Sequence, residues 1–333
     1  MEVSDSADLA EQKETEWQDI PNEIQSLIVR KLDLTNRLNA RYVSHQTRDL
    51  IDTSPFKIRL LMITVDDASI TWQAKGCSVG GDLKRYYTVS VRSILEVVLT
   101  EAQKEYIQPD YQCYQAAAAD DIKAVFSNDK LEVEELWIRT VRNHEIIEMN
   151  TRVFIRTFVR RLGNQKLSAA KLRISLNQTM PGSTQLMLDS MKEGTLRHFT
   201  LNSRDPNHHH DISLLVNTPQ WAGLKNFVSN NRINDFRPLF HLQIALSAVP
   251  PLNIQQVNDV IEHLLEKRDL KEWRLIFQAA NPRALFDGLR ATDVQAFPTK
   301  DYAMTGINKV LRVTVTDCQV CFNPIDLANV VVP

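Results

Sequence analysis

The sequence predicts an α/β protein in which a short helical module precedes a region of strands and helices. From residue 131 to 325, short apolar strand candidates alternate with amphipathic helix candidates, and only 9 glycines occur in the 333 residues. This alternation is typical of parallel strands joined by helical crossovers. Because the spacing between strand candidates is irregular, we expect an irregular leucine-rich-repeat-like α/β solenoid and not a closed barrel. An ordinary α/β layer domain is the alternative.

The helical module covers residues 17–59 and predicts three short helices. Asp19 is a candidate cap for the first helix, and Pro21 is tolerated only in a first turn. Thr35 and Ser44 are candidate caps for the second and third helices. A segment of roughly 40 residues without disulfides buries little core, so its apolar stripes are expected to dock on another surface. An amphipathic helix laid against an apolar groove is the docking mode that fits.

The next segment predicts a small antiparallel sheet or hairpins at 58–65, 69–73 and 85–91, followed by a helical stretch at 93–127. Beyond it the solenoid begins, and two final strands at 310–316 and 319–322 are expected to cap the open edge of its sheet. The other strand candidates are 136–138, 172–176, 196–201, 224–228, 239–246 and 273–277. The helix candidates between them are 150–162, 182–193, 210–221 and 253–267.

The helical module contains an ordered string of residues, namely Trp17, Asp19-Ile20-Pro21, Glu23-Ile24, Ile28, Leu32-Asp33-Leu34, Arg37-Leu38, Arg41, Val43-Ser44, Arg48 and Leu50-Ile51. This string resembles an F-box, the small domain that docks an adaptor onto Skp/cullin/F-box ubiquitin ligases. It departs from the family pattern at Ala40, where Leu is usual, and at Thr47, where a large apolar residue is usual. The resemblance implies that a Skp-type linker protein is bound by Ile20, Pro21, Ile24, Leu27, Ile28, Leu32, Leu38, Val43 and Leu50.

The C-terminal region contains a second set of characteristic residues, namely Leu214-Leu215, Thr218-Pro219-Gln220-Trp221, the segments 236–246, 257–265 and 273–277, Val310-Leu311-Arg312-Val313 and Phe322-Asn323-Pro324-Ile325. This set resembles the FTH (DUF38) domain of nematode F-box proteins, although Ala222-Gly223 replace the Lys that usually follows the Gln-Trp pair. A related nematode F-box-associated region is the alternative. The implied organisation is a disordered acidic tail at 1–16, an F-box at 17–59, a linker region at 60–130, an FTH-like target-binding domain at 131–325 and a C-terminal tail at 326–333.

Together the two resemblances imply a non-catalytic substrate receptor of a ubiquitin ligase, bound through the linker protein to a cullin and holding an unknown target protein. The alternative is a repeat-type protein-interaction or nucleic-acid-binding module that acts outside a ligase. A net charge of −2 gives no global electrostatic reason to expect nucleic acid or an anionic membrane as partner. No apolar run approaches the ~18 residues that span a bilayer. We therefore expect a cytoplasmic or nuclear protein.

The residue pattern gives little support for an enzymatic activity or a metal site. The sequence contains no phosphate-binding glycine loop and no G-x-S-x-G nucleophile motif. Cys318 and Cys321 form a lone C-x-x-C without the second ligand pair that structural zinc requires. The run His208-His209-His210 is interpreted as a solvated loop. We expect no cofactor, no metal and no enzymatic activity.

One basic segment has a specific alternative interpretation. Between residues 152 and 173 seven basic residues occur without an acidic one, and three arginines at a spacing of four share one helix face. A solvated outer face is the simpler interpretation. The functional interpretation is a docking patch for an acidic or phosphorylated target segment, because arginine matches carboxylate and phosphate geometry. The patch consists of Arg152, Arg156, Arg160 and Arg161.

Overall fold

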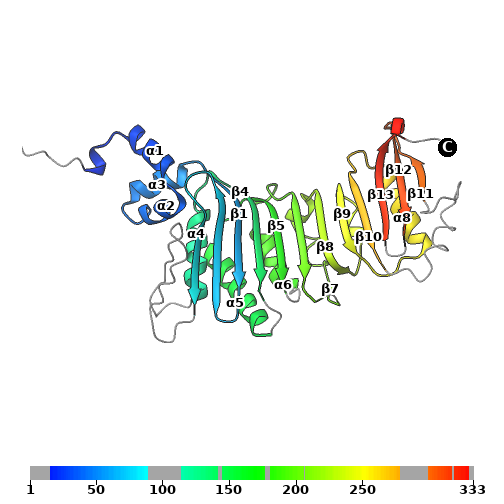
Figure 1. The fold of residues 1–333 in the computed structure, drawn as a ribbon, viewed down its shortest axis with the longest axis horizontal. Coiled ribbons are helices and arrows are strands. Elements are labelled where there is room, and N and C mark those ends of the chain that lie inside the picture. The colour runs from blue at the N-terminus through cyan, green and yellow to red at the C-terminus, as the bar shows by residue number, and fades with distance from the viewer. Residues whose placement is uncertain are drawn as a thin grey trace, which may run out of the picture.

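The computed structural model describes residues 16–88, 114–141, 145–176, 181–205, 207–277, 299–316 and 319–329. A small helical module lies at one end of a large mixed sheet, and the strands then follow side by side across the molecule to the C-terminal hairpins at the other end (Figure 1). Residues 1–15 of the predicted tail at 1–16 lie outside the described residues, as do Cys113, Cys318 and residues 93–113 of the predicted helical stretch. The predicted C-terminal tail at 326–333 begins with structured residues, because strand β13 (Gln319–Asp326) ends at Asp326 and a 3-10 turn covers Leu327–Asn329. Residues 330–333 lie outside the described residues.

The helical module contains the three predicted helices, with different caps at two of them. Asp33, not Thr35, caps the second helix by accepting a hydrogen bond from the Asn36 amide at 2.8 Å. Asp19 does not cap the first α-helix, because that helix begins only after Pro21. The prediction for Ser44 is confirmed, since its side chain accepts from the Thr47 amide at 3.1 Å. The elements are η1 (Trp17–Asp19), α1 (Asn22–Lys31), α2 (Leu34–Ala40) and α3 (His45–Thr53).

The sheet has 13 strands within the described residues. They are β1 (Phe56–Val65), β2 (Ser69–Cys77), β3 (Leu83–Thr88), β4 (Leu131–Thr140), β5 (Ala169–Leu176), β6 (His198–Ser203), β7 (His209–His210), β8 (Asn226–Ile233), β9 (Ile244–Ala248), β10 (Glu272–Ile276), β11 (Thr299–Ala303), β12 (Lys309–Val315) and β13 (Gln319–Asp326). Their spatial order is β11-β12-β13-β10-β9-β8-β6-β5-β4-β1-β2-β3, and β7 pairs with β8.

The central strands are parallel to one another, and they are β1, β4, β5, β6, β8, β9 and β10. The strands at both ends of the sheet pair in antiparallel fashion. The sheet is open, because β3 and β11 form its two edges and do not pair with each other. The last strands cap the β10 edge, as predicted, with β11 added outside them. Strand β1 pairs with β4, so the hairpins of the predicted linker region belong to the same sheet as the strands beyond residue 131. A leucine-rich-repeat-like solenoid is not confirmed.

The main helices lie on one side of this sheet (Figure 1). The predicted helix at 210–221 is wrong, because β7 and a run of turns occupy most of it and Thr218 caps only a single helical turn. The predicted strand at 239–246 begins only at residue 244. The elements are α4 (Tyr114–Phe126), α5 (Glu145–Leu162), α6 (Pro181–Ser190), α7 (Pro219–Ala222), η2 (Arg237–Leu239), α8 (Ile254–Leu265) and η3 (Leu327–Asn329).

Strand register separates a core face from an open face. Residues that face each other across the central strands form a fully buried row under the helices. This row is Leu61, Leu136, Leu172, Phe199, Phe227, Ala245, Trp273 and Phe322. Side chains alternate along a strand, so the neighbouring row points to the other side. We call that side the open face, and its central row is Met62, Trp137, Arg173, Thr200, Val228, Leu246 and Arg274.

Candidate protein-docking site

Helix α1 presents an apolar stripe to the outside of the molecule. Ile24, Leu27 and Ile28 are 46%, 53% and 37% exposed, and they fall at the i, i+3, i+4 spacing that forms one helix face. The opposite face of α1 is anchored by Val29, which is fully buried, and by Gln25. Helix α1 therefore packs on one side within the described chain through Gln25 and Val29, and it leaves its apolar stripe exposed.

Gln25 fixes the entry to this helix. Its buried side-chain amide donates two hydrogen bonds of 2.8 Å, one to the carbonyl of Trp17 and one to the carbonyl of Ile20. The Trp17 carbonyl also accepts from the Ile20 amide at 3.3 Å, and Ile20 follows the short η1 turn directly. The bonds hold η1 against α1, so the exposed stripe is presented by a rigid unit.

The other predicted linker-binding residues fall into three groups. Pro21 and Val43 are exposed, whereas Ile20, Leu32 and Leu50 are half-buried. Leu38 is only 4% exposed and belongs to the core. In the described chain Leu38 therefore supports the surface from beneath instead of forming it. Leu38 was included on its match to the family pattern, which does not separate core positions from surface ones.

Tyr42 is an exposed aromatic residue of the F-box region that the sequence pattern did not single out. It lies beside Val43 between α2 and α3, and it is 76% exposed. A large aromatic side chain left in solvent is unusual for a monomeric protein and is typical of interaction surfaces. The sequence did contain an indication of this exposure. Tyr42 and Val43 lie in a connection between helices, where no helical pattern of apolar residues predicts that they are buried.

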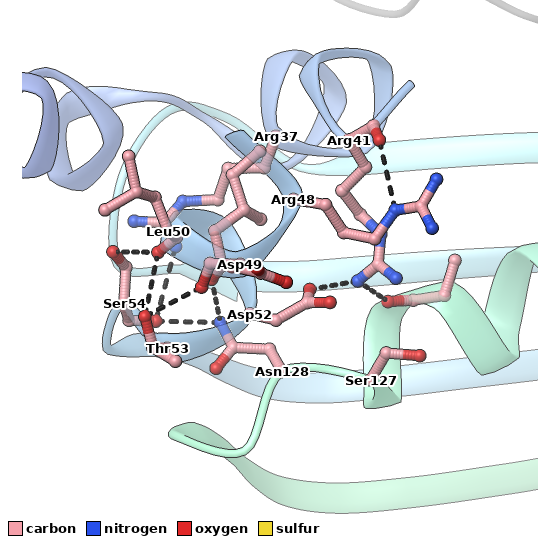
Figure 2. Close-up of polar contacts among 12 residues, drawn as sticks. Arg37, Arg41, Arg48, Asp49, Leu50, Asp52, Thr53, Ser54, Ser127 and Asn128 are labelled. Carbon is pink, nitrogen blue, oxygen red and sulfur yellow. Dashed lines mark hydrogen bonds and ion pairs between the residues drawn. The ribbon is translucent and has the colours of Figure 1, made fainter. Parts of the chain in front are cut away.

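The helical module is joined to the sheet region by a network of polar contacts (Figure 2). Arg41 forms an ion pair with Asp52 of α3 and donates a 3.1 Å hydrogen bond to the carbonyl of Ala124 in α4. Burial raises the pKa of the Asp52 carboxyl, and the positive charge of Arg41 opposes that shift. Arg48 donates to the Arg41 carbonyl at 3.3 Å. Helices α2 and α3 of the module are thus tied to α4 at one point.

A second set of bonds fixes the end of α3. Asn128, buried just after α4, donates to the carbonyls of Ile51 at 3.1 Å and Ser54 at 2.7 Å (Figure 2). Arg37, which is 2% exposed, lies over the Phe56 ring at 4.6 Å. Arg37 also donates to the carbonyl of Leu32 at 3.1 Å, to that of Ser54 at 3.5 Å and to that of Pro55 at 3.4 Å.

A glycine allows the third contact between module and sheet. Gly80, in the turn between β2 and β3, has a φ of 77° and lies against Asp33, the cap of α2. A Cβ at this position would overlap Asp33, so only glycine fits both the backbone conformation and the space. Three contact regions therefore set the orientation of the exposed α1 stripe relative to the sheet.

The predicted basic patch lies on α5, on the helix-covered side of the sheet. All four of its arginines are exposed. Arg161 pairs with an aspartate of α4 and Arg152 with a glutamate one turn earlier in α5, both at 3.5 Å. Arg156 and Arg160 form no ion pair among the described residues. The structure thus leaves two of the four charges without an acidic partner in the described chain.

The described residues contain no group of three or more His, Cys, Asp and Glu side chains arranged to hold a metal ion. Cys77 and Cys321 are free thiols, and burial raises the pKa of Cys77 to about 11, which keeps this thiol protonated at neutral pH. The histidine run is not a solvated loop, because His209–His210 pairs with β8 and His210 is fully buried. No helix of the described chain has the length and apolar character needed to cross a membrane.

Comparison with known proteins identifies one domain family in this chain. The family model of the F-box domain matches residues 17–59, which are the helical module and the first residues of β1. The chain therefore contains an F-box domain at these positions. No curated protein matches the chain, and no solved structure does.

Proposed function

We propose that this protein is the substrate-recognition adaptor of a Skp/cullin/F-box E3 ubiquitin ligase. The F-box binds the Skp-type linker protein, which connects it to the cullin, and the sheet region binds a target protein. The observation that carries the proposal is the exposed stripe of Ile24, Leu27 and Ile28 on the α1 helix of an F-box. An amphipathic helix with an unburied apolar face fits an apolar groove on a partner.

The adaptor contributes proximity and no catalytic group. It holds the target near a charged ubiquitin-conjugating enzyme, so that a bimolecular transfer becomes effectively intramolecular. This role requires a firm connection between the two binding regions. The contacts of Arg41, Asn128 and Gly80 support it, because they tie the F-box to α4 and to the β2–β3 turn.

We further propose that the C-terminal region is the FTH-like domain of a nematode F-box protein, located in the cytosol or nucleus. The Gln220-Trp221 pair supports this assignment, since both residues are buried and act structurally. Gln220 donates to the Met191 carbonyl at 2.9 Å, and the Trp221 indole donates to the Pro238 carbonyl at 3.3 Å. The Arg152, Arg156, Arg160 and Arg161 patch remains a proposed contact for an acidic target segment.

The test is co-purification of the full chain with a Skp-type linker protein. The double substitution Ile24→Asp and Ile28→Asp would bury two unpaired carboxylates in the apolar interface, at a cost of several kcal/mol, and is expected to abolish capture. The matched control is Met149→Asp with Val153→Asp, because these are also exposed apolar residues on one helix face, that of α5. The control is expected to retain capture.

Two outcomes would contradict the proposal. Capture that persists in the Ile24 and Ile28 double variant would move the linker contact away from α1. A native chain that captures no linker protein would leave a protein-interaction module acting outside a ligase, and Ala40 and Thr47 would be the first residues to restore to the family pattern.

A further inference from the structure

Two arginines on the open face of the sheet lie against one tryptophan. Arg173 of β5 is the register partner of Trp137 of β4, and its guanidinium carbon is 4.3 Å from the centroid of the indole. Arg139, two residues further along β4, lies 5.2 Å from the same ring. Both distances are within the range of cation–π attraction. The indole N–H donates to the Ser175 hydroxyl at 3.3 Å, which holds the ring in place.

Neither guanidinium forms an ion pair among the described residues, and the Nε atoms of Arg139 and Arg173 are buried without a hydrogen-bond partner there. An aromatic ring attracts a cation but does not neutralise it. Two positive charges therefore share a small area of the open face without a counter-charge from the described chain.

Two other basic residues on this face are paired within the described chain. Glu134 at the edge of the face pairs with Lys171 at 2.7 Å, and Lys171 is also the register partner of Glu135. Arg274 of β10 pairs with Glu272 at 2.9 Å. Arg139 and Arg173 have no such acidic partner among the described residues, so they leave an excess of positive charge beside Trp137.

Uncharged polar side chains surround the two arginines. Thr64 of β1 and Ser175 of β5 flank Arg139, and Thr200 of β6 is opposite Arg173. Their hydroxyl groups are hydrogen-bond donors. None of them carries a charge that would repel an anion, and the helices lie on the other side of the sheet, so the face is accessible within the described structure (Figure 1).

We propose that the open face around Trp137, Arg139 and Arg173 binds a segment of the target protein that carries a phosphorylated side chain. The two guanidiniums supply a charge of about +2, which matches the −1.5 to −2 of a phosphate ester at neutral pH, whereas a carboxylate carries only half as much. Guanidinium forks also match the geometry of phosphate oxygens. This inference rests on the proposed function, because it names the chemistry by which the adaptor recognises its target.

The experiment uses the purified full chain, both alone and together with the Skp-type linker protein, and an immobilised peptide library with a fixed phosphoserine. Matched libraries carry Ser or Glu at the fixed position. The native chain is expected to retain the phosphoserine library about tenfold more strongly than either matched library. The variant Arg139→Gln with Arg173→Gln keeps the polar stems and removes both charges, and it is expected to lose this preference.

Two control variants separate the proposed site from general charge effects. Lys192→Gln with Arg268→Gln removes two exposed charges from connections outside the strands, and Arg274→Gln removes a paired charge from the open face itself. Both are expected to keep the preference for phosphoserine. Equal thermal unfolding of all variants shows that the loss in the Arg139 and Arg173 variant does not come from unfolding.

Every other pattern overturns the inference. It fails if the phosphoserine library is retained no better than the Ser library, if the Glu library is retained equally well, or if the Lys192 and Arg268 control variant loses the preference. Capture of the linker protein reports separately on the proposed function. Intact capture without phosphoserine preference overturns this inference alone, and phosphoserine preference without capture overturns the ligase role alone.

Discussion

Asn128 donates a 2.7 Å hydrogen bond to the carbonyl of Ser54, and so satisfies the end of an F-box helix from a residue that follows α4. The same amide also reaches Ile51 at 3.1 Å. The last carbonyls of a helix have no partner inside that helix, and a buried one without any partner is destabilising. One side chain from the sheet region therefore completes α3 and fixes the F-box in place.

Asn128→Ala is expected to destabilise the chain by about 1–3 kcal/mol, because it leaves two buried carbonyls with fewer partners. The measurement is chemical denaturation of the native chain and the variant. Ser127→Ala is the control, since the Ser127 hydroxyl bonds only within α4, to the Lys123 carbonyl at 3.0 Å. A variant as stable as the native chain would show that Asn128 does not join the two regions.

Leu38 and Leu27 are expected to respond in opposite ways to truncation. Leu38 is buried, so Leu38→Ala should lower the free energy of unfolding by about 2–5 kcal/mol. Leu27 is 53% exposed, so Leu27→Ala should change stability by less than about 0.5 kcal/mol while weakening capture of the linker protein. Denaturation and co-purification of both variants check this. A stability loss at Leu27 as large as that at Leu38 would contradict the described packing of α1.

Gly80 and Gly81 offer a matched pair at the contact between the β2–β3 turn and α2. Gly80→Ala combines a left-handed backbone with overlap of Asp33, and a loss of about 1–2 kcal/mol or more is expected from the backbone alone. Gly81→Ala meets nothing within 4 Å and should be nearly neutral. Thermal unfolding of the two variants is the measurement. Equal melting temperatures would rule out the close approach of this turn to the F-box.

His210 is expected to make stability fall on acidification. Burial, with a smaller contribution from His208, lowers the pKa of His210 from 6.5 to about 4. The folded state holds this imidazole neutral, whereas the unfolded chain binds a proton below pH 6.5. Its contribution is therefore complete above pH 6.5 and is lost as pH falls toward 4, by on the order of 3 kcal/mol.

The measurement for His210 is the pH dependence of the free energy of unfolding, compared with His210→Gln. Other carboxyl and imidazole groups also titrate in this range, so the difference between the two curves is the relevant quantity. The native chain should show the steeper decline between pH 6.5 and 4. Parallel curves would mean that His210 is not held neutral in the folded state.

Several features of the fold could be predicted because they depend on local pattern. The cap at Ser44 and the strands at 172–176 and 310–316 follow from capping chemistry and from β-branched apolar runs. The 210–221 helix was wrong because its apolar spacing also fits a series of turns, and periodicity alone does not distinguish them. The F-box was recognisable for a different reason, since an ordered string of residues specifies it.

The sequence by itself determined the F-box at 17–59 and the alternation of strands and helices, because both depend on the order and spacing of residues along the chain. Only the tertiary structure decided that β1 pairs with β4, so that one sheet crosses the expected boundary at residue 131. It also decided that Leu38 is core and that Arg139 and Arg173 share the ring of Trp137. These relationships join residues through strand register and packing, which bring together positions that no local pattern connects.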